Sequence, residues 1–304
     1  MKNFSELGLS EAVAIAIAEL GFEKPTPIQS QVIPAMLESA KDLIALAQTG
    51  TGKTAAFGIP LVELIDTSAK KPQALVLAPT RELCVQIEND LKAFSAKTKH
   101  FYTVAVYGGA NIRTQIDQLR KGVQVVVATP GRLIDLLGRR AVDLSQIKYL
   151  VLDEADEMLN MGFQEDIDEI LSTTPKEKVT WLFSATMPTE IKSISKKYMK
   201  SPMEISAGNV NQTNANIEHQ YYLVQPKNKY AALKRILDYN PDIYGIIFCR
   251  TKAETQEIAE KLIKDGYNAD SLDGDVSQMQ RAKVRLAFRE RTLQMLIATD
   301  VAAC

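Results

Sequence analysis

Histidine and cysteine are both scarce in this sequence, which has two histidines and three cysteines among 304 residues. His100 and His219 are isolated, and Cys84, Cys249 and Cys304 show no CxxC-type spacing. We therefore expect neither a zinc site nor a disulfide framework. A reducing compartment suits cysteines of this kind.

The sequence also lacks a charge imbalance and long apolar runs. Lys plus Arg number 36 and Asp plus Glu number 37, which gives a net charge of −1. Any surface that binds nucleic acid must therefore be a local patch, because the sequence has no basic tail that would attract nucleic acid through overall positive charge. Residues 1–6 lack an apolar signal core, and no run approaches the roughly 18 apolar residues of a membrane span. We expect a soluble, cytoplasmic protein without a membrane partner.

The sequence does contain short β-rich runs that alternate with amphipathic stretches. With 304 residues and 46% hydrophobic content, it can bury a sizeable core in about two domains. The alternation is typical of βαβ units and predicts an α/β fold with parallel sheets. Before residue 190 we expect six strands that complete one domain, at 43–46, 74–77, 103–106, 123–127, 150–152 and 181–183.

Between residues 201 and 216 the composition shifts to Ser, Gly, Asn, Gln and Thr, which predicts a linker. We place the first domain at 1–207, the linker at 208–216 and the second domain at 217–304. The second domain should again alternate strands and helices. The expected strands lie near 219–223, 245–249, 270–272 and 293–297, and the expected helices at about 227–239, 253–264 and 277–290.

A glycine loop and an acidic quartet each follow an apolar run that should be a buried strand. The loop, Ala47-Gln48-Thr49-Gly50-Thr51-Gly52-Lys53-Thr54, follows the run 42–46. The quartet, Asp153-Glu154-Ala155-Asp156, follows the run 149–152. Ligands of open parallel sheets bind at the carboxyl ends of the strands. We therefore expect the two segments to share one ligand.

The glycine loop suits a phosphate chain. Backbone N–H groups around Gly50 and Gly52, together with the positive end of the following helix, can surround phosphate oxygens. Lys53 would reach the outer phosphates, and Thr54 would give its hydroxyl to Mg²⁺. The usual pattern has Gly where this sequence has Ala47. Taken alone, the segment could be only a turn that leads into a helix.

The acidic quartet suits a metal ion and a water molecule. Asp153 and Glu154 directly after a buried strand would be costly unless a cation or a hydrogen-bond donor met them. Mg²⁺ is usually held by one or two carboxylates together with substrate phosphates. Asp153 is then the metal ligand, and Glu154 is the candidate base that orients or deprotonates the water. The alternative is a solvated helix N-terminus enriched in acidic residues.

These residues resemble the DEAD-box ATP-dependent RNA helicases of bacterial type. The acidic segment continues as in that family to Met161-Gly162-Phe163, and further matching segments follow the family's order over nearly the whole chain. The family tolerates Ala at the start of its phosphate loop. The resemblance implies two RecA-like P-loop domains that close over ATP and RNA, the second incomplete here. It also implies ATP and Mg²⁺ as cofactors, and RNA-stimulated ATP hydrolysis coupled to local unwinding of RNA duplexes.

The resemblance also assigns nucleotide-binding and coupling residues. Gly21-Phe22 and Pro25-Thr26-Pro27-Ile28-Gln29, with Phe4 upstream, look like the adenine-recognising Q motif, which implies that Gln29 reads the adenine edge and Phe4 stacks on the ring. Ser184, Thr186 and Asp156 are implied to couple the phosphate state to domain closure. The full implied ATP-binding set is Phe4, Phe22, Thr26, Gln29, Gln48, Thr49, Gly50, Thr51, Gly52, Lys53, Thr54 and Ala55.

A third set is implied to contact the RNA backbone, largely independently of base sequence. Its members are Pro79, Thr80, Arg81, Gly108, Gly109, Thr129, Pro130, Gly131, Arg132, Arg250, Thr251, Gln278, Arg281 and Thr299. Plain alternatives remain for several of the residues assigned so far. Residues 129–131 could be a turn after a strand, Arg250 and Arg281 could be solvated charges, and Phe4 could pack the first helix onto the core.

In the family, a later segment carries arginines that contact the γ-phosphate, and Cys304 stands where the family's preceding segment has Arg. We therefore expect residues 1–304 to be a piece of a longer protein that binds ATP but hydrolyses it slowly. Arginine fingers are worth on the order of 10³ to 10⁵ in rate. Uncovered edge strands would also favour self-association. Two alternatives stay open, a non-catalytic ATP-gated RNA clamp and a DNA translocase of the wider helicase group.

Overall fold

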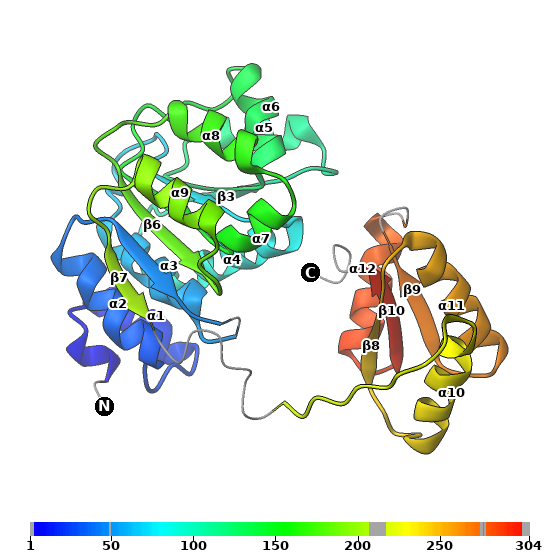
Figure 1. Cartoon of the computed structure of the whole chain (residues 1–304). Helices are drawn as coiled ribbons and strands as arrows, with labels where there is room; N and C mark the ends of the chain where they lie inside the picture. Colours follow the sequence, from blue (N-terminus) through cyan, green and yellow to red (C-terminus); the bar gives the residue numbers. More distant parts are fainter. Residues whose placement is uncertain (1–2, 49, 207–216, 274–275, 277, 300–304) are drawn as a thin grey trace. The chain divides into compact units, whose positions relative to one another are not determined.

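The computed structural model describes residues 3–48, 50–206, 217–273, 276 and 278–299 (Figure 1). Contacts within the chain divide it into two compact units, residues 1–213 and 214–304. The predicted linker, 208–216, lies outside the described residues, and the predicted domain boundaries stay predictions. Within the described part of the chain, no helix is long and apolar enough to cross a membrane.

The first unit is built on a seven-stranded sheet with the order β3-β4-β2-β5-β6-β1-β7. Every neighbouring pair is parallel, which confirms the predicted α/β class. Its strands are β1 (Leu43–Leu46), β2 (Ala74–Leu77), β3 (Thr103–Val106), β4 (Val125–Ala128), β5 (Tyr149–Leu152), β6 (Val179–Ser184) and β7 (Met203–Ser206).

Helices cover both faces of this sheet, as parallel strands require (Figure 1). Side chains alternate along β6, so Trp181 and Phe183 pack with one helical layer and Leu182 with the other. Trp181 is fully buried. The helices are η1 (Phe4–Glu6), α1 (Glu11–Glu19), α2 (Pro27–Glu38), α3 (Lys53–Leu64), α4 (Arg81–Phe94), α5 (Ile112–Arg120), α6 (Pro130–Gly138), α7 (Ala155–Asn160), α8 (Gln164–Ser172) and α9 (Thr189–Tyr198).

The six strands expected before residue 190 are present as β1 to β6, but the expectation that they complete the domain was wrong, because β7 adds a seventh. β7 pairs with β1 in the register Leu43↔Met203. It is a short edge strand whose side chains are mostly exposed, so it carries no apolar run that would reveal it. Asp42, just before β1, is buried and accepts backbone hydrogen bonds from Thr180 and Lys200. That carboxylate fixes β1 between its two neighbours.

The second unit has a three-stranded parallel sheet with the order β8-β10-β9. The expected strand at 219–223 was wrong: residues 217–225 form no strand, and Tyr221 and Leu223 are 88% and 94% exposed. On β8, at the edge of the sheet, Ile246 and Phe248 are also exposed. The elements are η2 (Pro226–Asn228), α10 (Lys229–Tyr239), β8 (Gly245–Cys249), α11 (Lys252–Lys264), β9 (Ala269–Leu272), α12 (Gln278–Arg289) and β10 (Met295–Thr299).

Candidate nucleotide and RNA sites

The glycine loop and the acidic quartet line one cavity of about 610 Å³. The loop leaves the carboxyl end of β1, and the quartet leaves the carboxyl end of β5. Lys53, Thr54, Asp153 and Glu154 are among the lining residues. The convergence of strand ends thus brings together side chains about a hundred residues apart in the chain.

The loop has the backbone geometry of a phosphate cradle. Gly50 and Gly52 have φ angles of 76° and 88°, in the left-handed region that favours glycine. Lys53 begins α3, its side chain is buried, and its Nζ has no hydrogen-bond partner among the described residues. A buried ammonium without a partner is costly, and an anion in the cavity would remove that cost. Thr49 lies outside the described residues.

The acidic side chains beside Lys53 are buried to different extents. Asp153 is 2% exposed, and burial raises its pKa to about 7, although the attraction of Lys53 opposes this. Glu154 is partly buried, and burial raises its pKa as well. The part of the chain that the structure describes holds no group of three His, Cys, Asp or Glu side chains suited to a metal ion. The residues present fit Mg²⁺, which takes most of its ligands from phosphate and water.

Gln29 connects the start of α2 to the glycine loop. Its Oε1 accepts a hydrogen bond from the Thr26 N–H at 2.9 Å, and the Gln29 N–H donates to Thr26 Oγ1 at 3.4 Å, which forms a capping box. Gln29 Nε2 donates to the Gly52 carbonyl at 3.1 Å. A Cβ on Gly52 would lie 2.3 Å from Gln29 Nε2, so any larger residue there would displace this carboxamide. Within the described residues, the Gln29 carboxamide uses one N–H in this way, and its second N–H could serve a ligand in the cavity.

The opposite part of the cavity is mainly apolar. Phe22 lines it and meets the ring of Phe94 edge-on, with centroids 5.9 Å apart. Phe4 does not line the cavity, because it is buried behind Phe22. The sequence reasoning missed the α4 residues in this wall, although they recur on one helical face after Arg81. These residues are Leu83, Gln86, Asp90, Ala93 and Phe94.

The segment after β6, taken here as residues 184–186 from the last residue of the strand onward, joins the acidic quartet to the glycine loop. Asp156 is buried, and its Oδ2 accepts hydrogen bonds from Thr186, just after β6. Ser184 is fully buried, and its carbonyl accepts a hydrogen bond from the Ala47 N–H at 3.1 Å. β6 lies between β1 and β5 in the sheet. The three predicted coupling residues therefore connect the ends of three adjacent strands.

The first unit also brings the three predicted RNA-contact segments together. Residues 79–81 follow β2, Gly108 and Gly109 follow β3, and residues 129–132 follow β4, which is the strand between β2 and β3. The Arg81 guanidinium reaches the second segment, since a Cβ on Gly109 would lie 2.2 Å from Arg81 Nη2. Arg132 donates two hydrogen bonds to the Ala110 carbonyl, both at 3.2 Å.

In the second unit, the predicted RNA-contact residues lie near the carboxyl ends of the strands. Arg250 and Thr251 follow β8, and the Thr251 hydroxyl accepts from the Glu254 N–H and caps α11. Thr299 ends β10. Arg281 on α12 donates to the Asp273 carbonyl at 3.2 Å. Gln278 opens α12, but its side chain lies outside the described part.

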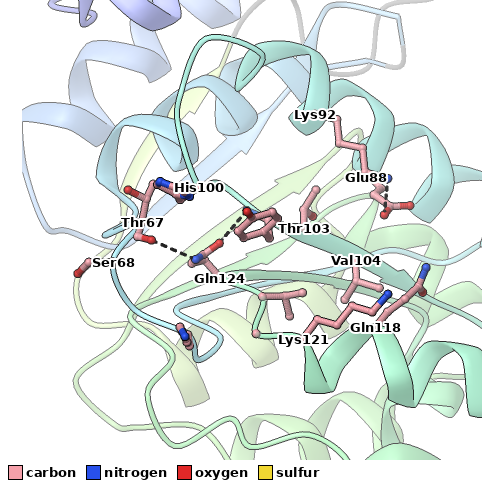
Figure 2. Close-up of a pocket in the computed structure, with 14 residues that line it drawn as sticks. Thr67, Ser68, Glu88, Lys92, His100, Thr103, Val104, Gln118, Lys121 and Gln124 are labelled. Carbon is pink, nitrogen blue, oxygen red and sulfur yellow. Dashed lines mark hydrogen bonds and ion pairs between the residues drawn. The ribbon is translucent and has the colours of Figure 1, made fainter.

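A second cavity, of about 700 Å³, lies at the amino ends of β3 and β4 (Figure 2). Gln124 is buried in its wall and accepts from the Tyr102 N–H at 2.7 Å. Its Nε2 donates to the Ala69 carbonyl at 2.8 Å and to the Thr67 carbonyl at 3.4 Å. This amide therefore holds the loop before β2 against the start of β3. Its hydrogen bonds stabilise the fold.

Two family models match the sequence. The model described as DEAD/DEAH box helicase matches residues 26–194, and the model described as helicase conserved C-terminal domain matches residues 228–304. The first match contains the glycine loop, the acidic quartet and the segment after β6. The second contains the three-stranded sheet and its flanking helices.

Curated relatives match over almost the whole chain. The "ATP-dependent RNA helicase DeaD" of Mycobacterium tuberculosis is 46% identical over 301 residues, which is 99% of this chain and 53% of that protein. The "DEAD-box ATP-dependent RNA helicase CshA" of Geobacillus kaustophilus is 47% identical over 303 residues, which is 100% of this chain and 64% of that protein. The chain thus spans only about half to two thirds of the length of these relatives.

Solved structures share the fold. A DEAD box protein from Methanococcus jannaschii is 44% identical, with a TM-score of 0.66 over 98% of this chain and 80% of that chain. S. cerevisiae Dbp5 bound to RNA and ADP BeF3 is 30% identical, with a TM-score of 0.88 over 100% of this chain and 77% of that chain.

Proposed function

This chain belongs to the DEAD/DEAH box helicase family, and on that premise we propose that it hydrolyses ATP in an RNA-stimulated reaction coupled to local unwinding of RNA duplexes. The single observation that carries the proposal is the shared cavity. It combines a buried Lys53 ammonium that has no hydrogen-bond partner in the described part of the chain, a buried Asp153 carboxylate and a mainly apolar wall. That combination suits a nucleoside triphosphate, which has an anionic chain and a flat ring.

The phosphate chain would lie on the glycine loop, residues 48–55, with Lys53 on its outer phosphates. Thr54 and Asp153 would hold Mg²⁺, partly through water, and the ion would neutralise charge on the phosphates. The base would enter the apolar part near Phe22, with Thr26 and Gln29 at its edge and Phe4 supporting Phe22 from behind. This arrangement assigns ring contact to Phe22 and a supporting role to Phe4.

Glu154 is the residue that we propose to orient or deprotonate the attacking water. It lines the cavity next to Asp153. Burial raises the pKa of Glu154, which makes its carboxylate a stronger base than that of an ordinary glutamate. Ser184, Thr186 and Asp156 would transmit the phosphate state, because hydrogen bonds join the segment after β6 to both the quartet and the loop.

RNA would bind along the strand ends of each unit. Backbone N–H groups, hydroxyls and arginines at these positions suit a sugar-phosphate chain, so recognition should be largely independent of base sequence. Contacts to 2′-hydroxyls would separate RNA from DNA. The similar S. cerevisiae Dbp5 structure is bound to RNA, which supports this proposal. The proposal includes all the RNA-contact residues named from the sequence, Gln278 among them.

We further expect a polypeptide of residues 1–304 to bind ATP but to hydrolyse it slowly. The γ-phosphate arginines that the resemblance implies have no counterpart in these residues. The cytoplasm is the proposed site of action. Self-association is a prediction supported by the exposed Ile246 and Phe248 on edge strand β8, and light scattering over a dilution series measures it.

The test is phosphate release from ATP with a single-stranded RNA, with a DNA of the same sequence and with no nucleic acid. We expect RNA to raise turnover and DNA to raise it far less. The Glu154→Gln variant should retain nucleotide affinity and lose turnover. Equal stimulation by DNA would identify a translocase, and ATP-dependent RNA retention without phosphate release would identify a clamp. Either result would overturn the proposal.

A further inference from the structure

A buried amide on α5 joins two of the predicted RNA-contact segments. Gln115 is 4% exposed, whereas Thr114, Asp117 and Gln118 on the same helix are exposed. Its Oε1 accepts a hydrogen bond from Arg132 Nη1 at 2.7 Å. Its Nε2 donates to the Tyr107 carbonyl at 3.2 Å. One side chain therefore bridges the loop after β3 and the start of α6.

Arg132 contacts the same loop on the other side of Gly108 and Gly109. Its guanidinium donates to the Ala110 carbonyl as well as to Gln115. The carbonyls of Tyr107 and Ala110, which flank Gly108 and Gly109, are thus both held by a single Gln–Arg pair. The planar guanidinium suits this role, because it can meet two acceptors at fixed angles.

The loop is also contacted by Arg81. The Arg81 guanidinium lies 5.8 Å from the centroid of the Tyr107 ring and close to the Cα of Gly109. Gly109 has a φ of 80°, so this turn of the loop needs both the backbone freedom and the small volume of glycine. The residue 107–110 loop is therefore fixed through contacts with both neighbouring RNA-contact segments.

We propose that Gln115 is a positioning residue for RNA binding, which acts through Arg132 and the 107–110 loop. The inference rests on the proposed function, and it changes the role of Arg132. Two of the guanidinium nitrogens of Arg132 serve the fold, so its main contribution is to shape the surface that meets the RNA backbone. A surface that is already ordered in the free protein binds its ligand more tightly, because less conformational entropy is lost on binding.

The test compares Gln115→Leu with Gln118→Leu, a control at an exposed position on the same helix. Labelled single-stranded RNA is titrated by fluorescence anisotropy in the presence of a non-hydrolysable ATP analogue. Affinity for a fluorescent ADP analogue is measured separately. We expect Gln115→Leu to weaken RNA binding by about tenfold, because the partly buried Arg132 guanidinium and the Tyr107 carbonyl each lose a partner. Nucleotide affinity should stay within about twofold, and Gln118→Leu should match the wild type.

Two further measurements separate positioning from general loss of structure. Hydrogen exchange should accelerate in the 107–110 loop of Gln115→Leu and stay unchanged around the glycine loop. The Gln115→Leu/Arg132→Met double variant should bind RNA no more weakly than the weaker single variant, since the two side chains act as a unit.

An unchanged RNA affinity, or a parallel loss of RNA and nucleotide affinity, would overturn the inference. Additive effects of the two substitutions would overturn it too. If the wild-type chain bound no RNA, the proposed function would fail, and the exchange rates would still decide whether Gln115 holds the loop.

Discussion

The Asp156 carboxylate accepts two hydrogen bonds from Thr186, one from the backbone N–H at 2.9 Å and one from the hydroxyl at 2.8 Å. Asp156 belongs to the acidic quartet after β5, and Thr186 follows β6. Charge-assisted bonds of this kind are among the stronger ones in proteins. We therefore expect a displacement of the quartet to be transmitted to the segment after β6.

The Thr186→Val variant tests this connection. It removes the hydroxyl donor and keeps the backbone donor and the branched shape. We expect affinity for a fluorescent ADP analogue within about twofold of the wild type and RNA-stimulated phosphate release reduced by about tenfold, the equivalent of one charged hydrogen bond. Thr189→Val, an exposed position at the start of α9, is the matched control. Unreduced release by Thr186→Val would exclude the coupling role.

Lys53→Met should separate nucleotide binding from stability. Nucleotide affinity is expected to fall by about a hundredfold or more, because charged hydrogen bonds to phosphate are lost. The free energy of unfolding without nucleotide should stay within about 1 kcal/mol, because the lost attraction to Asp153 is offset by removing a buried ammonium without a hydrogen-bond partner. Calorimetric titration and urea unfolding measure the two effects. Lys99→Met, at an exposed position, controls for loss of a positive charge.

Asp153 should make the free energy of unfolding of the nucleotide-free protein depend on pH. Burial raises the pKa of this carboxyl from 3.8 to about 7, so the folded protein keeps a proton that the unfolded chain releases. The contribution of Asp153 to stability should therefore fall as pH rises from about 4 to about 7. Asp153→Asn removes that contribution and leaves those of the other carboxyl groups. Urea unfolding of both proteins at several pH values should give a difference that grows toward neutral pH in favour of Asp153→Asn. A constant difference would contradict the prediction.

Adjacent glycines give a sharp comparison in the loop after β3. Gly109→Ala places a Cβ against the Arg81 guanidinium and requires alanine at a φ of 80°. Gly108→Ala meets no heavy atom within 4 Å. We expect Gly109→Ala to lower the free energy of unfolding by about 1 kcal/mol or more and to weaken RNA binding, whereas Gly108→Ala leaves stability nearly unchanged. Equal effects in urea unfolding and RNA titration would show that Arg81 does not restrict this loop.

The sequence predicted the polar residues of the cavity better than the residues that form its apolar wall. Gly50, Gly52, Lys53 and Asp153 stand in patterns whose spacing reflects phosphate and metal chemistry, and the parallel sheet brings them to one cavity. Phe94 gave no such signal, because an apolar residue late in an amphipathic helix is usually part of the core. Gln115 was also missed, since a polar residue in a polar helix is expected to face solvent.

The strands were predictable where burial produced an apolar run. β1 and β2 are buried on both faces, and the sequence located them at the residues where the structure has them. β7 has mostly exposed side chains, and nothing in its sequence distinguishes it from a loop. Residues 219–223 show the opposite case, since a run with a leucine and two tyrosines, which favour strands, forms no strand there. Strand formation needs a partner, and a single sequence does not show which partner is available.

The neighbours of β1 in the sheet are β6 and β7, and the Asp42 carboxylate meets backbone donors 138 and 158 residues further along the chain. During synthesis, the strand that leads into the glycine loop leaves the ribosome long before either neighbour exists. The nascent chain must keep that apolar segment from aggregating until residue 206 has emerged. We therefore expect ATP affinity to be acquired late in translation, and a ribosome-bound nascent chain that ends before β6 should show none.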